Sequence, residues 1–315
     1  MPIQHKILLA GAGYMGKEYA KVLKNMSLSF VVVGRSEKSA TDFKNETGID
    51  CKSGGLNNWL ENNQVPEWAI VTVTGDQLGI TTRELISAGC KNILVEKPGG
   101  LDNADLKLTL KSAKKFKTDV FVAYNRRFYA STLKADEIIK KDGGVKSFYF
   151  DFTERSSIIE ALNKPNKIKR GWFLHNSTHV IDMAFFLGGK PSKITPYKKR
   201  GGLKWHPSGS IYVGAGISDN YALFSYHANW ESAGRWGLEI MTPKSKLIFR
   251  PLEKLQIQKY GSMNIEDVPL DDKLDIEFKP GIYRQVESFL GNRHDLPTID
   301  EQVGNLKYYS LIEKR

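Results

Sequence analysis

The chain has 315 residues, of which 41% are hydrophobic and 26% are charged. This length is usual for two domains, and no run of apolar residues is long enough to cross a membrane. The formal net charge of +11 favours an anionic partner. Because the lysines are spread singly along amphipathic segments, we expect that partner to be a small molecule carrying phosphate, and we expect neither a nucleic acid nor a membrane.

The chain contains two cysteines, Cys51 and Cys90. They form no CxxC pair and have no histidine near them in sequence, so we expect neither a disulfide framework nor a thiolate metal site. The short apolar run that begins near residue 7 is interrupted by glycines and resembles no export signal. We therefore expect a reducing, cytoplasmic location.

Short apolar strands alternate with amphipathic helices in the first part of the chain. Strands are predicted over 6–11, 29–34, 67–75, 92–98 and 119–125, and helices over 16–26, 37–48, 81–89 and 103–117. Strands that alternate with helices of this length predict an α/β domain over residues 1–124, with a parallel sheet covered on both faces.

The pattern changes after residue 125. Strand-like runs are predicted over 145–155, 220–231, 236–243, 246–252 and 255–260, and helices over 171–189, 281–291 and 300–314. Most of these strands follow one another through turns, which favours an antiparallel sheet with one exposed face. We expect residues 125–315 to form an α+β domain with a large open, mostly antiparallel sheet. The last two helices are candidates to pack back on the first domain.

A glycine-rich turn follows the first predicted strand directly and opens the first predicted helix. Gly11 permits a tight turn, Gly13 lets a ligand approach the backbone, and Gly16 lets the helix pack closely on the strand. The amides of the helix N-terminus then face the phosphates. The motif predicts a nicotinamide dinucleotide, with Tyr14 and Met15 of the same turn as further contacts.

The end of the second predicted strand bears on the choice between NAD and NADP. An NAD enzyme usually carries an acidic residue there, which accepts hydrogen bonds from the ribose hydroxyls. This chain has Arg35 and Ser36 instead, and an arginine can pair with the additional phosphate of NADP. Glu37 weakens the argument, since a shift of one residue restores an acid. We expect NADP(H) to be preferred, with NAD(H) as the alternative.

Polar residues also end two other predicted strands. Thr74 closes the strand over 67–75, and Glu96 and Lys97 close the strand over 92–98. Ligands bind at the carboxyl ends of the strands in such sheets, so we expect these side chains to face the cofactor. The alternative for Lys97 is a solvent-exposed lysine in a turn.

The predicted helix 171–189 carries His175, His179 and Asp182 in an otherwise apolar run. Spacings of four and three residues place all three side chains on one face of a helix. Three interpretations remain open: a metal site, an acid/base site, or histidines satisfied within the core.

Four motifs, in this order along the chain, resemble the glucose-fructose oxidoreductase/inositol dehydrogenase/MocA (Gfo/Idh/MocA) superfamily. They are GAGYMG, EKP, VAYNRRF and HNSTHVID. The resemblance implies an N-terminal Rossmann domain and a second domain whose open sheet commonly forms homodimers or homotetramers. It also implies nicotinamide-dependent oxidation or reduction at a carbon that bears oxygen, commonly on a sugar, a polyol or a sugar nucleotide.

The resemblance also implies roles for single residues. Lys97 matches the lysine that contacts the reacting hydroxyl, and His179 matches the histidine that moves the proton. Asp182 matches an acid whose role is structural or orienting. His175 stands where many members have Asp or Asn, so its role as a second catalytic residue or a substrate contact is less secure. The family as a whole requires no metal.

Further candidates for substrate contact lie near these motifs. Asn125 and Arg126 follow the strand over 119–125, and Arg126 is equally suited to tethering the two domains. Trp172 can stack on a sugar ring or fill the core. Arg235 can hold a phosphate or point into solvent.

The sequence thus predicts an NADP-preferring dehydrogenase or reductase of a sugar, sugar nucleotide or polyol, with a role in polysaccharide or modified-sugar biosynthesis. The alternatives are a reductase of a non-sugar carbonyl and a cofactor-sensing regulator without turnover.

Overall fold

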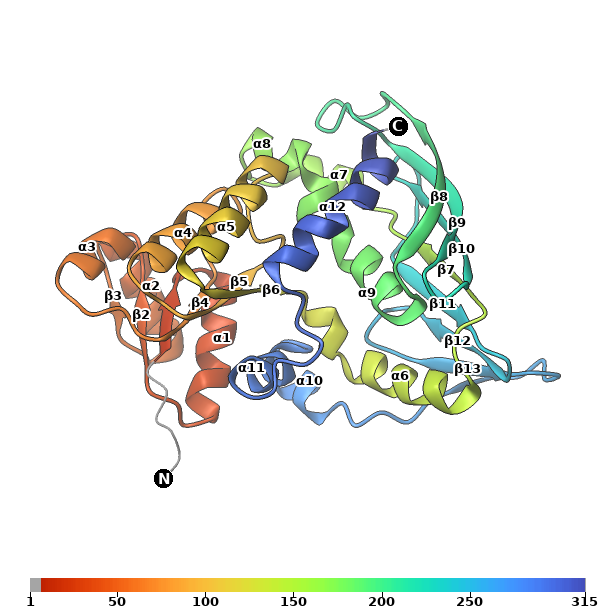
Figure 1. The fold of residues 1–315 in the computed structure, drawn as a ribbon, viewed down its shortest axis with the longest axis horizontal. Helices are drawn as coiled ribbons and strands as arrows, with labels where there is room; N and C mark the ends of the chain where they lie inside the picture. Colours follow the sequence, from red (N-terminus) through yellow and green to blue (C-terminus); the bar gives the residue numbers. More distant parts are fainter. Residues whose placement is uncertain (1–6, 315) are drawn as a thin grey trace. The chain divides into compact units, whose positions relative to one another are not determined.

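The structure is a computed structural model that describes residues 7–314 (Figure 1). Residues 1–6 and 315, at the outer ends of the two predicted domains, lie outside the described part. The chain divides into two units. The first consists of the residues up to Tyr124 together with Glu277–Gly304, and the second of Asn125–Ile276 together with the residues from Asn305 onward.

The first unit contains a six-stranded sheet in the order β3-β2-β1-β4-β5-β6, and every neighbouring pair is parallel. The strands are β1 (Ile7–Ala10), β2 (Phe30–Val33), β3 (Cys51–Lys52), β4 (Trp68–Val71), β5 (Asn92–Glu96) and β6 (Asp119–Ala123). All residues of β1, β4 and β5 are buried, as expected for a sheet covered on both faces. This is the predicted Rossmann sheet, and β3, which has only two residues, is the one strand that the sequence did not reveal.

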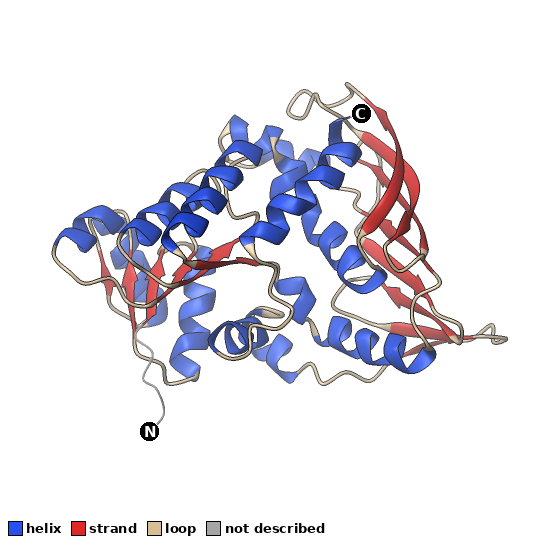
Figure 2. Ribbon diagram, in the orientation of Figure 1, coloured by secondary structure: helices blue, strands red, loops and turns tan. Residues whose placement is uncertain are grey.

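Helices lie on both faces of this sheet (Figure 2). They are α1 (Tyr14–Asn25), α2 (Glu37–Thr47), α3 (Gly55–Glu61), α4 (Leu78–Ser87), α5 (Asn103–Phe116) and α11 (Ile282–Leu290). α4 packs beside α5, and α1 packs beside α11. The segment that contains α11 thus returns from near the end of the chain to complete the first unit.

The second unit contains an eight-stranded sheet in the order β14-β13-β12-β11-β7-β10-β9-β8. The strands are β7 (Ser147–Asp151), β8 (Pro191–Lys199), β9 (Ile211–Ser218), β10 (Leu223–Asn229), β11 (Gly237–Met241), β12 (Ser245–Phe249), β13 (Gln256–Lys259) and β14 (Ile265–Asp267). Only β7 and β10 pair in parallel, so the sheet is mostly antiparallel, as predicted.

The sequence did not reveal β8 and β9, for identifiable reasons. β8 contains Pro191 and Pro196, which a strand tolerates at the edge of a sheet. β9 contains Gly214 and Gly216, and in each case a Cβ atom would collide with an aromatic ring of β10, that of Tyr226 or Phe224. The glycines make room for these rings and weaken the alternating pattern from which a strand is predicted.

Two helices pack on this sheet: α9 (Thr178–Gly188) lies against β7 and β11, and α6 (Ala130–Asp142) lies against β12. The remaining helical segments are α7 (Ser156–Ala161), α8 (Asn166–Arg170), α10 (Lys273–Glu277) and α12 (Ile299–Lys314), with a 3-10 turn, η1 (Asn125–Phe128), and a π turn, η2 (Phe173–Ser177). Phe185 of α9 packs edge-on against Phe148 and Phe150 of β7, with ring centres 6.0 and 5.4 Å apart. This aromatic core anchors α9 on the sheet. None of the helices between residues 7 and 314 is both long and apolar enough to span a membrane.

Candidate active site

In the glycine turn between β1 and α1, two of the three glycines have no space for a side chain, and the third faces open space. Gly11 has a φ of +118°, and a Cβ atom on it would lie 2.7 Å from Thr72 Oγ1. A Cβ atom on Gly16 would collide with the carbonyl oxygen of Gly11. A Cβ atom on Gly13, which caps the N-terminus of α1, would meet no atom within 4 Å. The backbone is therefore bare where a pyrophosphate has to approach, and the turn fits a dinucleotide.

Three more predicted cofactor contacts lie near this edge of the sheet. Tyr14 opens α1 with an exposed ring, and the ammonium group of Lys279 lies 5.2 Å from the ring centre. Met15 follows it and is partly exposed. Thr74 lies exposed beyond the end of β4, where its carbonyl oxygen accepts a hydrogen bond from Gln77 N (2.7 Å). All of these residues belong to the first unit.

After β2, the arginine is exposed, and the serine and glutamate that follow it already accept hydrogen bonds within the protein. Arg35 is exposed, and within residues 7–314 it forms no ion pair. Ser36 caps α2, and its hydroxyl oxygen accepts a hydrogen bond from Ser39 N (3.3 Å). The carboxylate of Glu37 accepts a hydrogen bond from the Ser53 hydroxyl. Glu37, the acid that could replace the usual ribose-binding carboxylate, thus already accepts a hydrogen bond from Ser53.

Glu96, at the carboxyl end of β5, is buried in a polar network that the sequence analysis missed. The Tyr19 hydroxyl of α1 lies 3.0 Å from Glu96 Oε1 and 2.8 Å from Gln285 Oε1 of α11. Burial raises the pKa of Glu96, and the adjacent Lys97 opposes this rise. The network connects the helix of the glycine turn, the strand β5, which Lys97 follows directly, and a helix from near the chain end.

The turn after Lys97 is held by a second residue that the sequence analysis missed. Gln302 of α12 donates from Nε2 to the Pro98 carbonyl oxygen (3.1 Å) and to the Tyr124 hydroxyl (3.0 Å). Lys97 itself is partly exposed, as a residue that contacts a ligand must be. Nothing in the local sequence pattern distinguishes Gln302, because its burial and its partners are set by the tertiary fold.

In the second unit, α9 positions His179 and Asp182. His179 is 7% exposed. Asp182 is held by Arg127 of η1, which donates from Nε to Oδ2 (2.8 Å) and from Nη2 to Oδ1 (2.6 Å). The orienting role expected of Asp182 thus has a concrete geometry: the ion pair fixes α9 one turn beyond His179.

His175 differs from the expectation of one continuous helix. It lies in the π turn η2 and is buried, with 7% of its surface exposed. A π turn bonds residues five apart instead of four, so His175 and His179 are not related by one regular α-helical turn. Within residues 7–314, His, Cys, Asp and Glu side chains form no group of three that could hold a metal ion.

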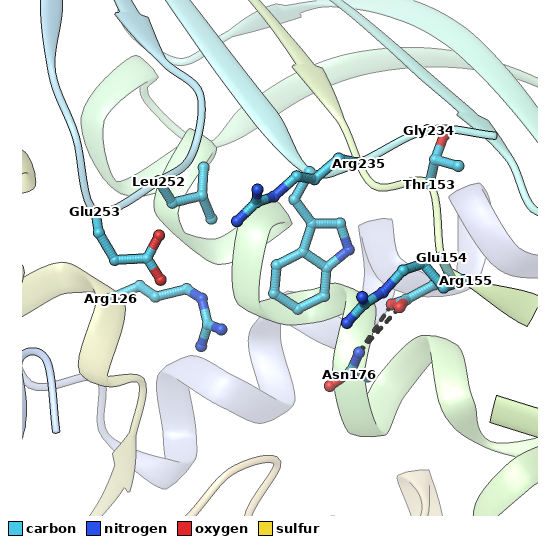
Figure 3. Close-up of a pocket in the computed structure, with 10 residues that line it drawn as sticks. Arg126, Thr153, Glu154, Arg155, Asn176, Gly234, Arg235, Leu252 and Glu253 are labelled. Carbon is cyan, nitrogen blue, oxygen red and sulfur yellow. Dashed lines mark hydrogen bonds between the residues drawn. The ribbon is translucent and has the colours of Figure 1, made fainter. Parts of the chain in front are cut away.

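The second unit contains a cavity of about 400 Å³ (Figure 3). It is lined by Arg126, Thr153, Glu154, Arg155, Asn176, Gly234, Arg235, Trp236, Leu252 and Glu253. Two of the predicted substrate contacts, Arg126 and Arg235, are among these residues. Trp236 connects the cavity to the predicted proton-transfer residue, because its ring centre lies 6.1 Å from that of His179.

Three predicted substrate contacts do not line this cavity. Trp172 is buried in the core and packs edge-on against Trp205, with ring centres 6.4 Å apart, which is the alternative that the sequence left open for it. Asn125 is also buried and accepts a hydrogen bond from Arg126 Nη1 (3.3 Å). His175, in η2, is the third.

Comparison with known proteins agrees with this architecture. Residues 5–124 match the oxidoreductase family with an NAD-binding Rossmann fold, GFO_IDH_MocA. The chain is 24% identical over 190 residues to myo-inositol 2-dehydrogenase of Thermotoga maritima. This match covers 59% of the chain and spans 55% of the length of that enzyme.

Solved structures share the fold over nearly the whole chain at low identity. Levoglucosan dehydrogenase, in complex with NADH and L-sorbose, has a TM-score of 0.79 at 15% identity, with 98% of this chain and 95% of that chain covered. UDP-N-acetylglucosamine 3-dehydrogenase of Acidithiobacillus ferrooxidans has a TM-score of 0.75 at 13% identity, with 99% and 97% covered. An NAD-binding oxidoreductase of Klebsiella pneumoniae has a TM-score of 0.76 at 16% identity, with 98% and 96% covered. Residues 5–124 thus match the Gfo/Idh/MocA oxidoreductase family model, and the whole chain shares the two-unit fold of these solved oxidoreductases.

Proposed function

We propose that this protein is a nicotinamide-dependent oxidoreductase that acts on a carbinol or carbonyl carbon of a sugar, a polyol or a sugar nucleotide. The observation that carries the proposal is the glycine turn, which is open at Gly13 and follows β1 in the same sheet as β5, the strand that Lys97 follows directly. The named relatives act on inositol, levoglucosan and UDP-N-acetylglucosamine, which are polyhydroxylated molecules. The bound nicotinamide would supply the hydride acceptor or donor.

The protein's own contribution is to handle the hydroxyl proton. When hydride leaves a carbinol carbon, the O–H bond must also break, and we assign its proton to an imidazole nitrogen of His179. The ammonium group of Lys97 stabilises the negative charge that develops on the substrate oxygen. In the direction of reduction, the same groups return the proton to the carbonyl oxygen. Asp182 and Arg127 act by holding α9 in place.

The proposed cofactor preference is for NADP(H) over NAD(H). Arg35 is exposed at the carboxyl end of β2 and available for the additional phosphate. The residues directly after the strand, Gly34, Arg35 and Ser36, include no acid, and the carboxylate of Glu37 accepts a hydrogen bond from the Ser53 hydroxyl. A charge-assisted hydrogen bond contributes about 1.5–3 kcal/mol, so the preference can reach one to two powers of ten.

We also propose that the protein forms a homodimer or homotetramer through the open face of the eight-stranded sheet. Tyr197, Val213 and His227 lie side by side across β8, β9 and β10. Tyr197 and Val213 are exposed apolar residues on that face. Light scattering of the purified protein is expected to give two or four times the chain mass of 35.5 kDa, and a monomer would contradict this assignment.

Turnover of the purified protein tests the proposed function. The near-ultraviolet absorbance of reduced nicotinamide is followed with NADP+ and NAD+ against polyols, free sugars, sugar phosphates and nucleotide-linked sugars. We expect turnover with at least one of these classes, at a higher kcat/KM for NADP+. Binding of both cofactors without turnover, in either direction and for every class, would overturn the proposal and favour a cofactor-sensing protein.

A further inference from the structure

The cavity of the second unit is lined by three arginines, which transfer of a hydroxyl proton does not require. Arg126 belongs to η1, Arg155 lies directly before α7, and Arg235 lies two residues before β11. Figure 3 shows their guanidinium groups pointing toward the same space. Three separate segments of the second unit therefore contribute positive charge to one cavity.

In the described part of the chain, none of these three guanidinium groups forms an ion pair with a carboxylate. Arg126 donates to Asn125 Oδ1 over 3.3 Å, while its Nε atom is buried and has no hydrogen-bond partner. A buried donor without a partner costs free energy, and a bound acceptor would recover it.

The cavity also contains two carboxylates, which bear on its charge. Glu154 is buried, and its oxygens accept hydrogen bonds from Asn176 Nδ2 (3.0 and 3.1 Å) and from Ser177 Oγ (2.8 Å). Glu253 is exposed at the rim. Three cations against two anions leave the cavity positive, and the buried carboxylate already accepts hydrogen bonds from two side chains of η2. The cavity favours an anionic ligand.

Trp236 lies close both to Arg126 and to the proposed proton-transfer residue, His179. The guanidinium carbon of Arg126 is 4.9 Å from the centre of the Trp236 ring, and the His179 ring centre is 6.1 Å from it. The indole is partly exposed and presents a flat apolar surface on which the C–H face of a sugar ring can lie. One molecule can thus touch Trp236, the arginines and the surroundings of His179.

We infer that this cavity binds an anionic group of the substrate, a phosphate or a carboxylate, which Arg126, Arg155 and Arg235 hold while the sugar ring packs on Trp236. The inference rests on the proposed function for the claim that the ligand is the substrate. Arginine suits this task because its planar group donates two parallel hydrogen bonds to a carboxylate or phosphate.

Binding of three probes that differ only at one carbon tests the inference. Glucose, glucose 6-phosphate and glucuronate are titrated into the full-length protein without cofactor, and the dissociation constants are measured by calorimetry. We expect at least one of the two anions to bind at least about tenfold more tightly than glucose. Arg155→Gln and Arg235→Gln are each expected to reduce that preference about tenfold.

The control variant is Arg200→Gln, which removes an exposed arginine that does not line the cavity. We expect Arg200→Gln to bind the anionic probes more tightly than glucose, as wild type does. Tighter binding of glucose 6-phosphate alone identifies a phosphate, and tighter binding of glucuronate alone identifies a carboxylate. Equal binding of all three probes, or a preference that survives in Arg155→Gln and Arg235→Gln, overturns the inference.

Failure of the anion-site inference can be distinguished from failure of the proposed function, because the binding measurement needs neither cofactor nor turnover. An arginine-dependent anion preference in a protein that turns over no substrate would leave the anion site intact and reject the oxidoreductase.

Discussion

Arg127 and Asp182 form a buried ion pair with two parallel hydrogen bonds of 2.8 and 2.6 Å. Their side chains are 6% and 2% exposed. The pair joins η1, which follows the last strand of the Rossmann sheet in sequence, to α9, the helix that carries His179. It therefore fixes the position of the proposed proton-transfer residue within the second unit.

Removal of the charge on Asp182 is expected to destabilise the protein strongly. Asp182→Asn removes the counter-charge that Asp182 provides to the buried Arg127 guanidinium, at a cost of about 3–5 kcal/mol in the free energy of unfolding. Unfolding in denaturant measures this cost. The control is Glu137→Gln in the exposed Lys134–Glu137 pair (2.7 Å), which is expected to cost no more than about 1 kcal/mol. Equal costs for the two variants would show that the buried pair does not hold α9.

Two glycine variants separate cofactor binding from folding. Gly13→Ala places a methyl group in open space, so the melting temperature is expected to stay nearly constant while cofactor affinity falls at least about tenfold. Gly16→Ala forces the methyl group against the carbonyl oxygen of Gly11, so stability is expected to fall. Thermal unfolding and cofactor fluorescence distinguish the two effects. Undiminished cofactor affinity in Gly13→Ala would argue against pyrophosphate binding at this turn.

Arg35 is expected to determine the preference between the two cofactors. Arg35→Ala should weaken NADPH binding about ten- to a hundredfold and leave NADH binding nearly unchanged, because only NADPH carries the additional phosphate. Lys24→Ala, at the far end of α1, removes one positive charge from the same unit and serves as the control. If both variants lost NADPH affinity equally, net charge alone would explain the effect.

Glu96 is expected to make stability depend on pH. Its pKa is raised by burial above the ordinary value of 4.5, so the folded protein holds this proton more tightly than the unfolded chain does. The stability that Glu96 contributes is present below pH 4.5 and is lost as the pH rises through the folded-state pKa. Glu96→Gln cannot titrate, so wild type is expected to lose stability relative to this variant above pH 4.5. Denaturant unfolding across a pH series measures the difference, and a constant difference would contradict the assignment.

The sequence was sufficient for five strands of the Rossmann sheet because these strands are runs of apolar residues, and the first four are each followed by a helical pattern. Buried parallel strands have no exposed face, so a continuous apolar run marks them. The strands of the second sheet are harder to recognise. Pro196 and Gly214 lower the strand propensity of β8 and β9, which are stabilised by pairing with their neighbours.

The site was only partly predictable, because its polar contacts join residues that are distant in sequence. Arg127 and Asp182 are 55 positions apart, and Tyr19 and Gln285 are 266 apart. Spacing motifs identify groups on one helix or one turn, such as His179 with Asp182. They do not show which buried side chain from another element satisfies them. The π turn at His175 was unpredictable for a similar reason, since local helical periodicity does not reveal it.

The central claim is that Lys97 and His179 handle the proton of a nicotinamide-dependent reaction. The most direct measurement compares the rate of NADP+ reduction in wild type, Lys97→Met and His179→Asn, with cofactor affinity determined for each. We predict that both variants bind the cofactor nearly as wild type does and lose at least about a hundredfold in kcat. Variants that turn over as fast as wild type would contradict the account.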